Sequence, residues 1–130
     1  MQSPRTAPTV SIGLPVYNGE KFLAQALDSV LAQSYGDFEV IVSDNASDDA
    51  TREICDAYAA RDTRVVYHRH ARNRGAAFNY NFCVTQAHGR FFKWLAHDDL
   101  IHPKFLKACM DVDRARPDGV AAIVPRVCWI

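Results

Sequence analysis

Two adjacent carboxylates, Asp98 and Asp99, are the residues of this chain best suited to chemistry, and they follow an apolar stretch, residues 91–95, that is typical of a strand. Neighbouring carboxylates repel each other unless a cation or hydrogen-bond donors compensate. Mg²⁺ or Mn²⁺ would compensate, because hard cations take oxygen ligands and are commonly held by one or two carboxylates together with substrate phosphates. Since side chains alternate along an extended strand, we expect the two acids to have different roles. One would bind the metal, and the other would contact a ribose hydroxyl or a metal-bound water. The alternative is that one of them only turns the chain and caps the helix expected near Pro103.

Other polar residues follow the other expected strands, and they are Pro15, Tyr17 and Asn18, then Asp44 and Asn45, then Arg72 and Arg74. The Asp44 carboxylate can accept a hydrogen bond from the imide of a pyrimidine, or it can shape the turn and cap the next helix. Tyr17 can stack on a base or fill the rim of the core. Arg72 and Arg74 can pair with phosphate, at the start of a helix whose N-terminus favours anions, or they can form a solvated basic loop. His97, directly before the acidic pair, is a candidate for contact with a phosphate or a metal-bound water.

The elements that would position these residues alternate along the chain. Short apolar runs predict strands over 9–14, 38–42, 65–67 and 91–95, and helical periodicity predicts helices over 20–33, 50–61, 75–87 and 103–116, with Asn18 as the first N-cap. This alternation predicts a three-layer α/β/α fold with a mostly parallel sheet, in which ligands bind outside the carboxyl ends of the strands. The segments 120–124 and 127–130 are also apolar and strand-like. Because some element must cover them, we expect the domain to continue past residue 130 or a second copy to form a homo-oligomer through this end.

Composition narrows the class of protein. The 130 residues suffice for one compact domain, and 48% hydrophobic with 23% charged residues is typical of soluble globular proteins. Fifteen basic residues balance fifteen acidic ones, which argues against nucleic acid as a partner. Residues 1–8 predict a flexible lead without a secretory signal, and hence a cytoplasmic protein. The four cysteines form no Cys-x-x-Cys pair and are expected to be structural thiols, and the glycine motifs of NTPases, NAD enzymes and serine hydrolases are absent.

Four segments, taken in order, resemble the family 2 glycosyltransferases, whose catalytic domain has the GT-A fold, and they are residues 11–19, 39–47, 73–81 and 93–99. The resemblance implies a Rossmann-like sheet and a nucleotide-diphospho-sugar donor, by default a UDP-sugar. It also implies a saccharide or lipid-linked acceptor hydroxyl, displacement at the anomeric carbon with inversion, and a divalent cation, Mg²⁺ or Mn²⁺. An enzyme of this kind could work in the cytoplasm or at the inner face of the membrane.

The resemblance also implies roles for individual residues. Pro15, Tyr17 and Asp44 match positions that cradle the nucleoside, with Asp44 on the base. Arg74, rather than Arg72, matches a position that contacts the base or a phosphate. Asp98 and Asp99 match the Asp-x-Asp region, with Asp99 as the metal ligand, and His97 stands where many relatives carry a third acid. Asn18 and Asn45 adjoin these positions and complete the expected substrate-binding set.

The catalytic base of the family lies beyond the Asp-x-Asp region, and we expect it beyond residue 130. Residues 9–130 are therefore interpreted as the donor-binding part of a glycosyltransferase. The alternative is a module that binds nucleotide-sugars without transferase activity. A receiver-type signalling domain is disfavoured, because its acids should follow the first strand, where this chain has Pro15 to Asn18.

Overall fold

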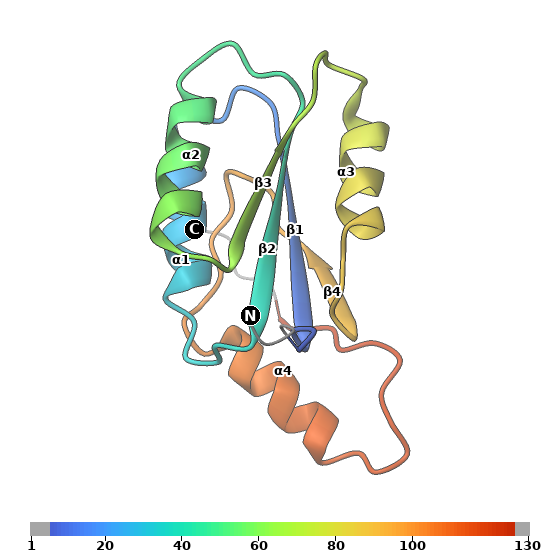
Figure 1. Cartoon of the computed structure of the whole chain (residues 1–130). Helices are drawn as coiled ribbons and strands as arrows, with labels where there is room; N and C mark the ends of the chain where they lie inside the picture. Colours follow the sequence, from blue (N-terminus) through green and yellow to red (C-terminus); the bar gives the residue numbers. More distant parts are fainter. Residues whose placement is uncertain (1–5, 127–130) are drawn as a thin grey trace, which may run out of the picture.

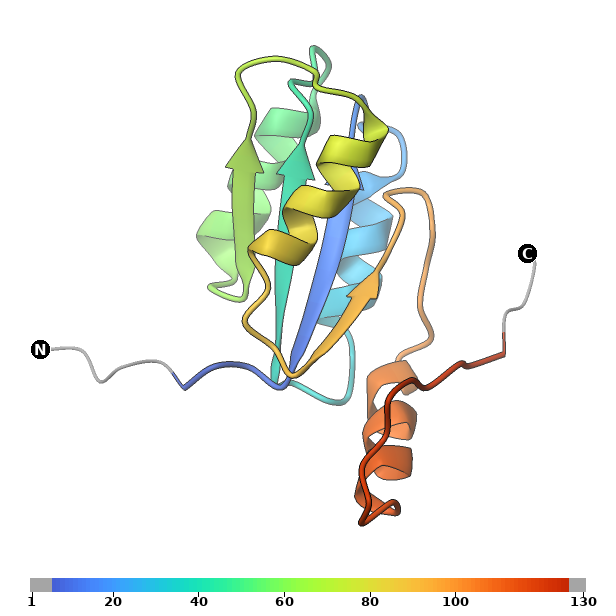
Figure 2. The same cartoon turned by 90° about the vertical axis from the view of Figure 1, so that its right-hand side faces the viewer.

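The computed structural model describes residues 6–126, and a four-stranded, fully parallel sheet forms its centre (Figure 1). The strands are β1 (Val10–Val16), β2 (Phe38–Asp44), β3 (Val65–Arg69) and β4 (Phe91–Trp94), in the order β3-β2-β1-β4. The helices are α1 (Leu23–Leu31), α2 (Thr51–Arg61), α3 (Ala76–Thr85) and α4 (Phe105–Arg114). Helices α1 and α2 cover one face of the sheet and α3 covers the other (Figures 1 and 2). The predicted three-layer α/β/α arrangement is therefore confirmed.

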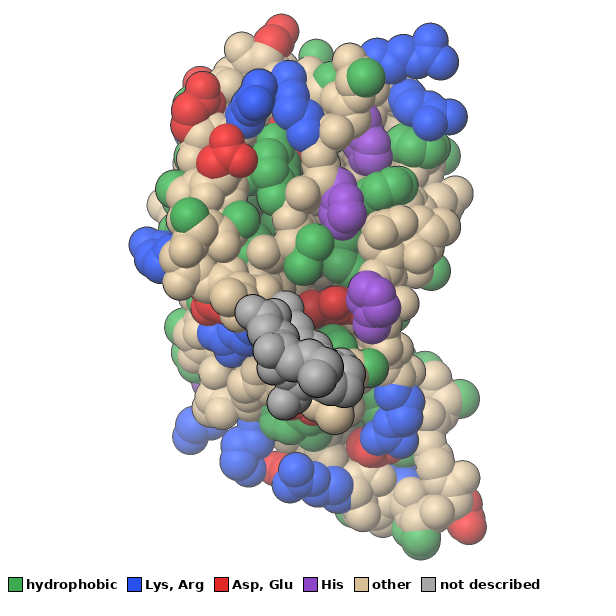
Figure 3. All heavy atoms as spheres, viewed as in Figure 1, with side chains coloured by type: hydrophobic (Ala, Val, Ile, Leu, Met, Phe, Trp, Pro, Cys, Tyr) green, Lys and Arg blue, Asp and Glu red, His purple; other side chains and the backbone are tan. Residues whose placement is uncertain are grey.

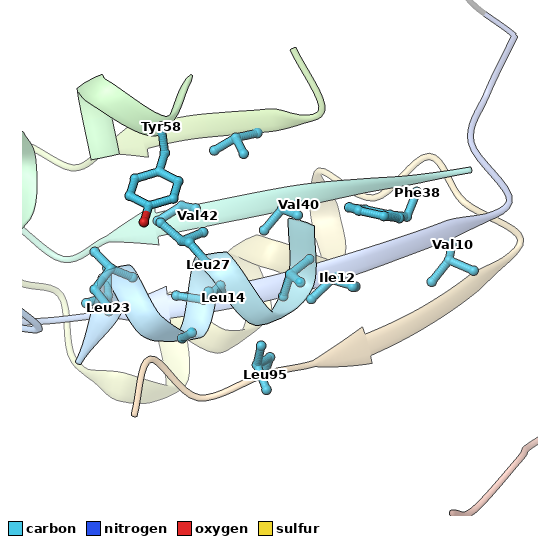
Figure 4. Packing of buried hydrophobic residues seen from close by; sticks show 14 of the residues in the cluster. Val10, Ile12, Leu14, Leu23, Leu27, Phe38, Val40, Val42, Tyr58 and Leu95 are labelled. Atoms are coloured by element: carbon cyan, nitrogen blue, oxygen red, sulfur yellow. The ribbon is translucent and has the colours of Figure 1, made fainter. Parts of the chain in front are cut away.

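The face of the sheet under α1 and α2 is apolar (Figure 4). Leu23 and Leu27 of α1 are completely buried and pack in one cluster with side chains from three strands, among them Ile12, Leu14 and Val42. Apolar residues recur at three- and four-residue spacing along α1, which turns one continuous stripe of the helix towards the sheet. Burial of this stripe is the main source of stability on this face.

The face under α3 is more polar, with Ser11, Glu39 and Ser43 on it besides Gly13 and the buried Ile41. Gly13 of β1 lets α3 approach closely, since a Cβ atom there would lie 2.7 Å from Cβ of Cys83 and 2.6 Å from Cζ of Phe92. At the amino end of the sheet, Ser11 Oγ donates to Glu39 Oε1 over 2.6 Å, and the His88 backbone N–H donates to the same oxygen over 2.8 Å. Hydrogen bonds thus hold the chain after α3 against β1 and β2.

Strands β1 and β4 separate before β1 ends. Their pairing stops at Gly13 opposite Trp94, with one further hydrogen bond from the Leu95 N–H to the Gly13 carbonyl, whereas β1 stays paired with β2 as far as Val16 opposite Asp44. Backbone groups point alternately to the two neighbouring strands, so the missing N–H of Pro15 lies on the β4 side. We expected β1 to stop at Pro15, and that was wrong, because the strand needs no N–H there once β4 has turned away.

Two other expectations are corrected. Helix α1 begins at Leu23 after Phe22, without a side-chain cap, so Asn18 is not its N-cap. Residues 120–124 form no strand: the chain runs there beside α4 and faces β4 across a pocket without pairing with it (Figure 2). The strand expected over 127–130 lies outside the described residues. Helix α4 itself lies near the amino ends of the strands, far from their carboxyl ends (Figure 2).

Two cysteines behave as predicted. Cys55 and Cys83 are completely buried and free, and burial raises their thiol pKa values to about 12 and about 11. Cys109 is free and half-buried, and Cys128 lies outside the described residues. No helix among residues 6–126 is long and apolar enough to cross a membrane.

Candidate functional site

A cleft of about 360 Å³ opens at the carboxyl ends of the strands, where β1 and β4 have separated and α3 begins. It includes three of the predicted substrate-binding residues, Pro15, Tyr17 and Asn45. Tyr17 is 46% exposed, so its ring is available to a ligand. The cleft is lined by Pro15, Val16, Tyr17, Asn45, Asn73, Gly75, Ala76, Asn79, Tyr80 and His97.

Asp44 lies behind the cleft wall and is completely buried. Its Oδ1 accepts hydrogen bonds from the backbone N–H and the hydroxyl of Ser47, over 2.9 and 2.6 Å. Its Oδ2 accepts from the Tyr67 hydroxyl over 2.6 Å and from Arg69 Nη1 over 3.1 Å. The turn-shaping interpretation of Asp44 is therefore confirmed, while its contact with a base stays a prediction.

Tyr67 and Arg69 were not predicted from the sequence to take part in the site. Burial and the hydrogen bond to Asp44 raise the pKa of Tyr67, so its hydroxyl remains a proton donor at neutral pH. Their spacing of two residues could have indicated that both side chains lie on the same face of β3. What decides the contact is the register, in which Arg69 pairs with Asp44 itself.

Asn45 shapes the loop that begins α3. Its Nδ2 donates to Asn73 Oδ1 over 2.9 Å and to the Gly75 carbonyl over 3.1 Å, and its Oδ1 accepts from the Arg74 N–H over 2.9 Å. Gly75 has a φ of +89°, which only glycine adopts readily. The first turn of α3 carries no side-chain cap, and Gly75 and Ala76 line the cleft, so unpaired backbone N–H groups of the helix start lie beside it.

The two predicted basic residues lie at the edge of this loop. The guanidinium carbon of Arg74 lies 3.9 Å from the centre of the Phe78 ring, a cation–π contact that holds Arg74 beside the start of α3. Arg72 and Arg74 are both exposed and neither lines the cleft. Arg74 is therefore held beside the start of α3 but outside the cleft lining, and Arg72 is exposed.

Asn18 has a structural role next to the site. It adopts a left-handed φ of +50° and its Oδ1 accepts from the Asp48 N–H over 3.0 Å. Its own N–H donates to Ser47 Oγ over 2.9 Å. These bonds join the loop after β1 to the loop after β2, so the two loops form one rigid rim. Asn18 is exposed and lies outside the cleft lining, and its expected contact with substrate stays a prediction.

The acidic pair lies in a turn. Strand β4 ends at Trp94, four residues before Asp98, so the expectation that the two acids alternate along an extended strand was wrong. Both acids are exposed, and within residues 6–126 neither side chain has a hydrogen-bond or ion-pair partner. Just before them, His97 packs against Gly19, where a Cβ atom would lie 2.9 Å from the imidazole Cδ2.

The acidic pair suits a cation that needs only one or two protein carboxylates, such as Mg²⁺ or Mn²⁺. Among the described residues no group of three or more His, Cys, Asp or Glu side chains converges on a point, so the protein offers no closed cage. Mg²⁺ and Mn²⁺ do not need one, since one or two carboxylates suffice when waters and a ligand diphosphate supply the remaining oxygens. The free carboxylates of Asp98 and Asp99 meet that requirement.

Comparison with known proteins identifies the family. The family model described as glycosyl transferase family 2 matches residues 11–129, which include both strand ends at the cleft and the acidic turn. The chain belongs to glycosyl transferase family 2. An uncharacterized glycosyltransferase of Rickettsia typhi is 39% identical to this family 2 chain over 97 residues, which are 75% of this chain and 29% of the relative.

Solved structures agree with this assignment and establish the GT-A fold. TarS from S. aureus, residues 1–349, superposes with a TM-score of 0.77 at 28% identity, over 82% of this family 2 chain and 32% of that one. It is also known in complex with UDP and with UDP-GlcNAc. The mannosyltransferase PcManGT from Pyrobaculum calidifontis, in complex with GDP-Man and Mn²⁺, superposes with a TM-score of 0.73 at 25% identity, over 88% of this chain and 34% of that one. The chain thus spans about a third of the length of each of these three proteins.

Proposed function

We propose that the cleft binds the nucleotide-diphospho-sugar donor of an inverting glycosyltransferase, which passes the sugar to a saccharide or lipid-linked hydroxyl. The observation that carries this proposal is the convergence of Tyr17, the start of α3 and His97 around one opening, with free carboxylates at 98 and 99 beyond it. The similar proteins whose structures contain UDP, UDP-GlcNAc or GDP-Man support a donor of this class. The nucleotide-binding module without transferase activity remains the alternative function.

Each group in and around the cleft has a use in this reaction. The exposed Tyr17 and the buried Pro15 beside it form a partly apolar wall for the nucleoside. The free N–H groups at the start of α3 favour the negative charge of a diphosphate. Arg74, stacked on Phe78 in the first turn of the same helix, offers a cation for a phosphate or base oxygen. Asp44 is buried behind this wall, and its hydrogen bonds with Ser47 and Tyr67 hold the turn after β2 against β3.

Asp98 and Asp99 would hold Mg²⁺ or Mn²⁺, and His97 would orient a metal-bound water or a phosphate. When bound, the cation would stabilise the charge that develops on the leaving diphosphate. Asp99 is proposed as the principal ligand and Asp98 as a second ligand or a ribose contact. Because the acceptor hydroxyl must lose a proton, the reaction also needs a general base, and none is assigned among these residues.

Calorimetric titration of UDP, GDP and dTDP into the protein tests this proposal, first with Mn²⁺ and then with excess EDTA. We expect one nucleotide to bind with Mn²⁺ and to lose at least tenfold in affinity with EDTA or in Asp99→Ala, because its diphosphate is then left without a counter-charge. Asp118→Ala, at an exposed acid near the end of α4, is the matched control and should bind as the wild type does. Failure of all three nucleotides to bind would contradict the proposal, and equal affinity in Asp99→Ala would refute the metal site.

A further inference from the structure

Three hydrogen bonds connect His70, just after β3, to the backbone of the cleft. His70 Nε2 lies 2.8 Å from Ser43 Oγ, and Ser43 Oγ lies 2.6 Å from Asn79 Oδ1. Asn79 Nδ2 lies 3.3 Å from the Val16 carbonyl oxygen. The bonds run between β3, β2, α3 and β1 in turn, across the face of the sheet that α3 covers. None of the roles assigned above uses His70 or Ser43.

The direction of every donor in this series follows from its last member. The Val16 carbonyl can only accept, so Asn79 must turn its amide nitrogen towards Val16 and its oxygen towards Ser43. The Ser43 hydroxyl therefore gives its single hydrogen to Asn79. Its oxygen is then free to accept, so the hydrogen of the first bond must come from His70 Nε2. One arrangement of hydrogens satisfies all three bonds.

The series ends inside the candidate cleft. Val16 and Asn79 both line it, and the Val16 carbonyl also accepts from the Asn45 N–H over 3.0 Å. Ser43 is completely buried and Asn79 is 4% exposed, so water does not compete well for these bonds. An amide nitrogen has two hydrogens and Val16 uses one of them, which leaves Asn79 one donor in a residue that borders the cleft.

We propose that Ser43 and His70 are positioning residues for the donor site, which hold the Asn79 amide in the one orientation that leaves its second N–H for an oxygen of the bound nucleotide-sugar. This inference rests on the proposed function of the cleft. Without Ser43, or with a Ser43 hydroxyl that His70 no longer orients, only the 3.3 Å bond to the Val16 carbonyl holds the Asn79 amide, so its second N–H is less firmly held in place for the ligand. The two residues act through Asn79 and do not touch the ligand.

His70 packs among aromatic side chains, which fix its ring. Its centroid lies 4.5 Å from that of Phe82 and 5.1 Å from that of Phe78, with edge-on geometry in both cases. Burial, together with the neighbouring charges of His68 and Arg74, lowers the pKa of His70, while Asp44 opposes this shift. The ring is therefore neutral at neutral pH, and the hydrogen on Nε2 defines a single tautomer. Figure 3 shows histidine side chains, in purple, along this junction of β3 and α3.

Nucleotide affinity in four variants tests the inference. We expect Ser43→Ala and His70→Leu to weaken the binding of UDP or GDP with Mn²⁺ by about five- to tenfold, the effect of one neutral hydrogen bond. His70→Gln should restore affinity to within about twofold of the wild type, because its amide nitrogen can donate from a similar place. His68→Leu is the matched control. His68 lies two residues earlier, on β3, packs on Phe82 at 5.2 Å and has no side-chain hydrogen bond among the described residues, so His68→Leu should bind as the wild type does.

The outcomes separate this inference from the proposed function. A wild-type protein that binds no nucleotide would overturn the proposed function and the positioning role with it. A wild type that binds, with Ser43→Ala and His70→Leu binding equally well, would overturn the positioning role alone. The positioning role alone would also be overturned if His70→Gln bound the nucleotide no better than His70→Leu.

A spectroscopic measurement keeps the test independent of variants that fold poorly. Nitrogen chemical shifts of the His70 ring, from ¹⁵N–¹H correlation spectra of the wild-type protein at neutral pH, should show the Nε2–H tautomer. The same spectra of His68 provide the internal comparison, because its ring has no partner in the described part of the chain to select a tautomer. A His70 ring with its hydrogen on Nδ1 would contradict the direction of the series and overturn the inference.

Discussion

The face of the sheet under α1 and α2 and the face under α3 belong to the same four strands but are packed by different forces. Under α1, completely buried aliphatic side chains such as Ile12 and Leu27 interlock, and such contacts have little directional preference. Under α3, Ser43, Glu39 and Asn79 are buried polar residues, each with a specific hydrogen-bond partner. These directional bonds fix how α3 is rotated about its own axis and how far it lies from the sheet. Residues of α3 form part of the cleft wall. The apolar face thus supplies most of the stability, and the polar face supplies the geometry of the site.

The largest expected effect comes from the apolar face. Leu27→Ala removes a fully buried side chain from the cluster under α1 and should lower the free energy of unfolding by about 3 kcal/mol. Urea unfolding followed by circular dichroism measures this loss. Under conditions where the variant is folded, its nucleotide affinity should match that of the wild type.

Leu31→Ala, at a half-buried leucine on the same helix, is the control for this variant. Its loss should be clearly smaller, because less apolar area becomes exposed. Equal losses at the two positions would mean that the packing under α1 is not as described.

A smaller loss of stability is expected on the polar face, with a larger effect on the site. Gly13→Ala places a methyl group within 2.7 Å of Cys83 Cβ and should cost about 1–3 kcal/mol through overpacking. Because α3 must move away from the sheet, nucleotide affinity should fall as well. Gly36→Ala, where the new Cβ would meet nothing closer than Arg64 Nη1 at 3.8 Å, should change neither quantity. Unchanged nucleotide binding in Gly13→Ala would break the link between α3 packing and the cleft.

The smallest expected effect is a pH dependence at Glu39. Burial disfavours its charged form, but hydrogen bonds from Ser11 and His88 outweigh burial and lower its pKa below the ordinary value of 4.5. A carboxyl with a lowered folded-state pKa stabilises the fold above its unfolded-state pKa, and that contribution is lost as the pH falls through the folded-state value. The wild type should therefore lose more stability than Glu39→Gln between roughly pH 5.5 and 3.5.

Urea midpoints measured across this pH range provide the comparison. Glu53→Gln, at an exposed position on α2, should follow the wild-type curve. Parallel curves for wild type and Glu39→Gln would show that the hydrogen bonds of Glu39 do not stabilise its ionised form.

The contrast between the faces also explains what the sequence could predict. The stripe of α1 repeats at helical spacing and the strands are short apolar runs, so the parallel α/β fold and the strand ends that carry polar residues followed from local patterns. Helix α3 has no such stripe, because the sheet face beneath it mixes polar side chains with Gly13 and Ile41, and its hydrogen-bond partners lie on distant strands. Asn79 was recognised as part of a motif, but its bonds to Ser43 and Val16 depend on tertiary structure.

Two site residues show the same limit. Asp44 stood out as a polar residue at a strand end, yet its partners Tyr67 and Arg69 are set by the register of β2 with β3, which no local pattern records. Asp98 and Asp99 were found from their types alone, but the chain leaves the strand at Trp94, so their side chains do not follow the strand alternation. Long-range register and the exact end of a strand are the features that local sequence describes least well.

The separation of β1 from β4 at Gly13 has a consequence for redesign. The opening of the cleft is produced by backbone, at a proline that cannot extend the pairing, and not by the removal of large side chains. Side chains around the opening, such as Tyr17 and Tyr80, can therefore be exchanged to change which ligand fits without closing the opening itself. The backbone opening stays fixed while the side chains around it can change, a property that favours the evolution of different ligand preferences on one unchanged sheet.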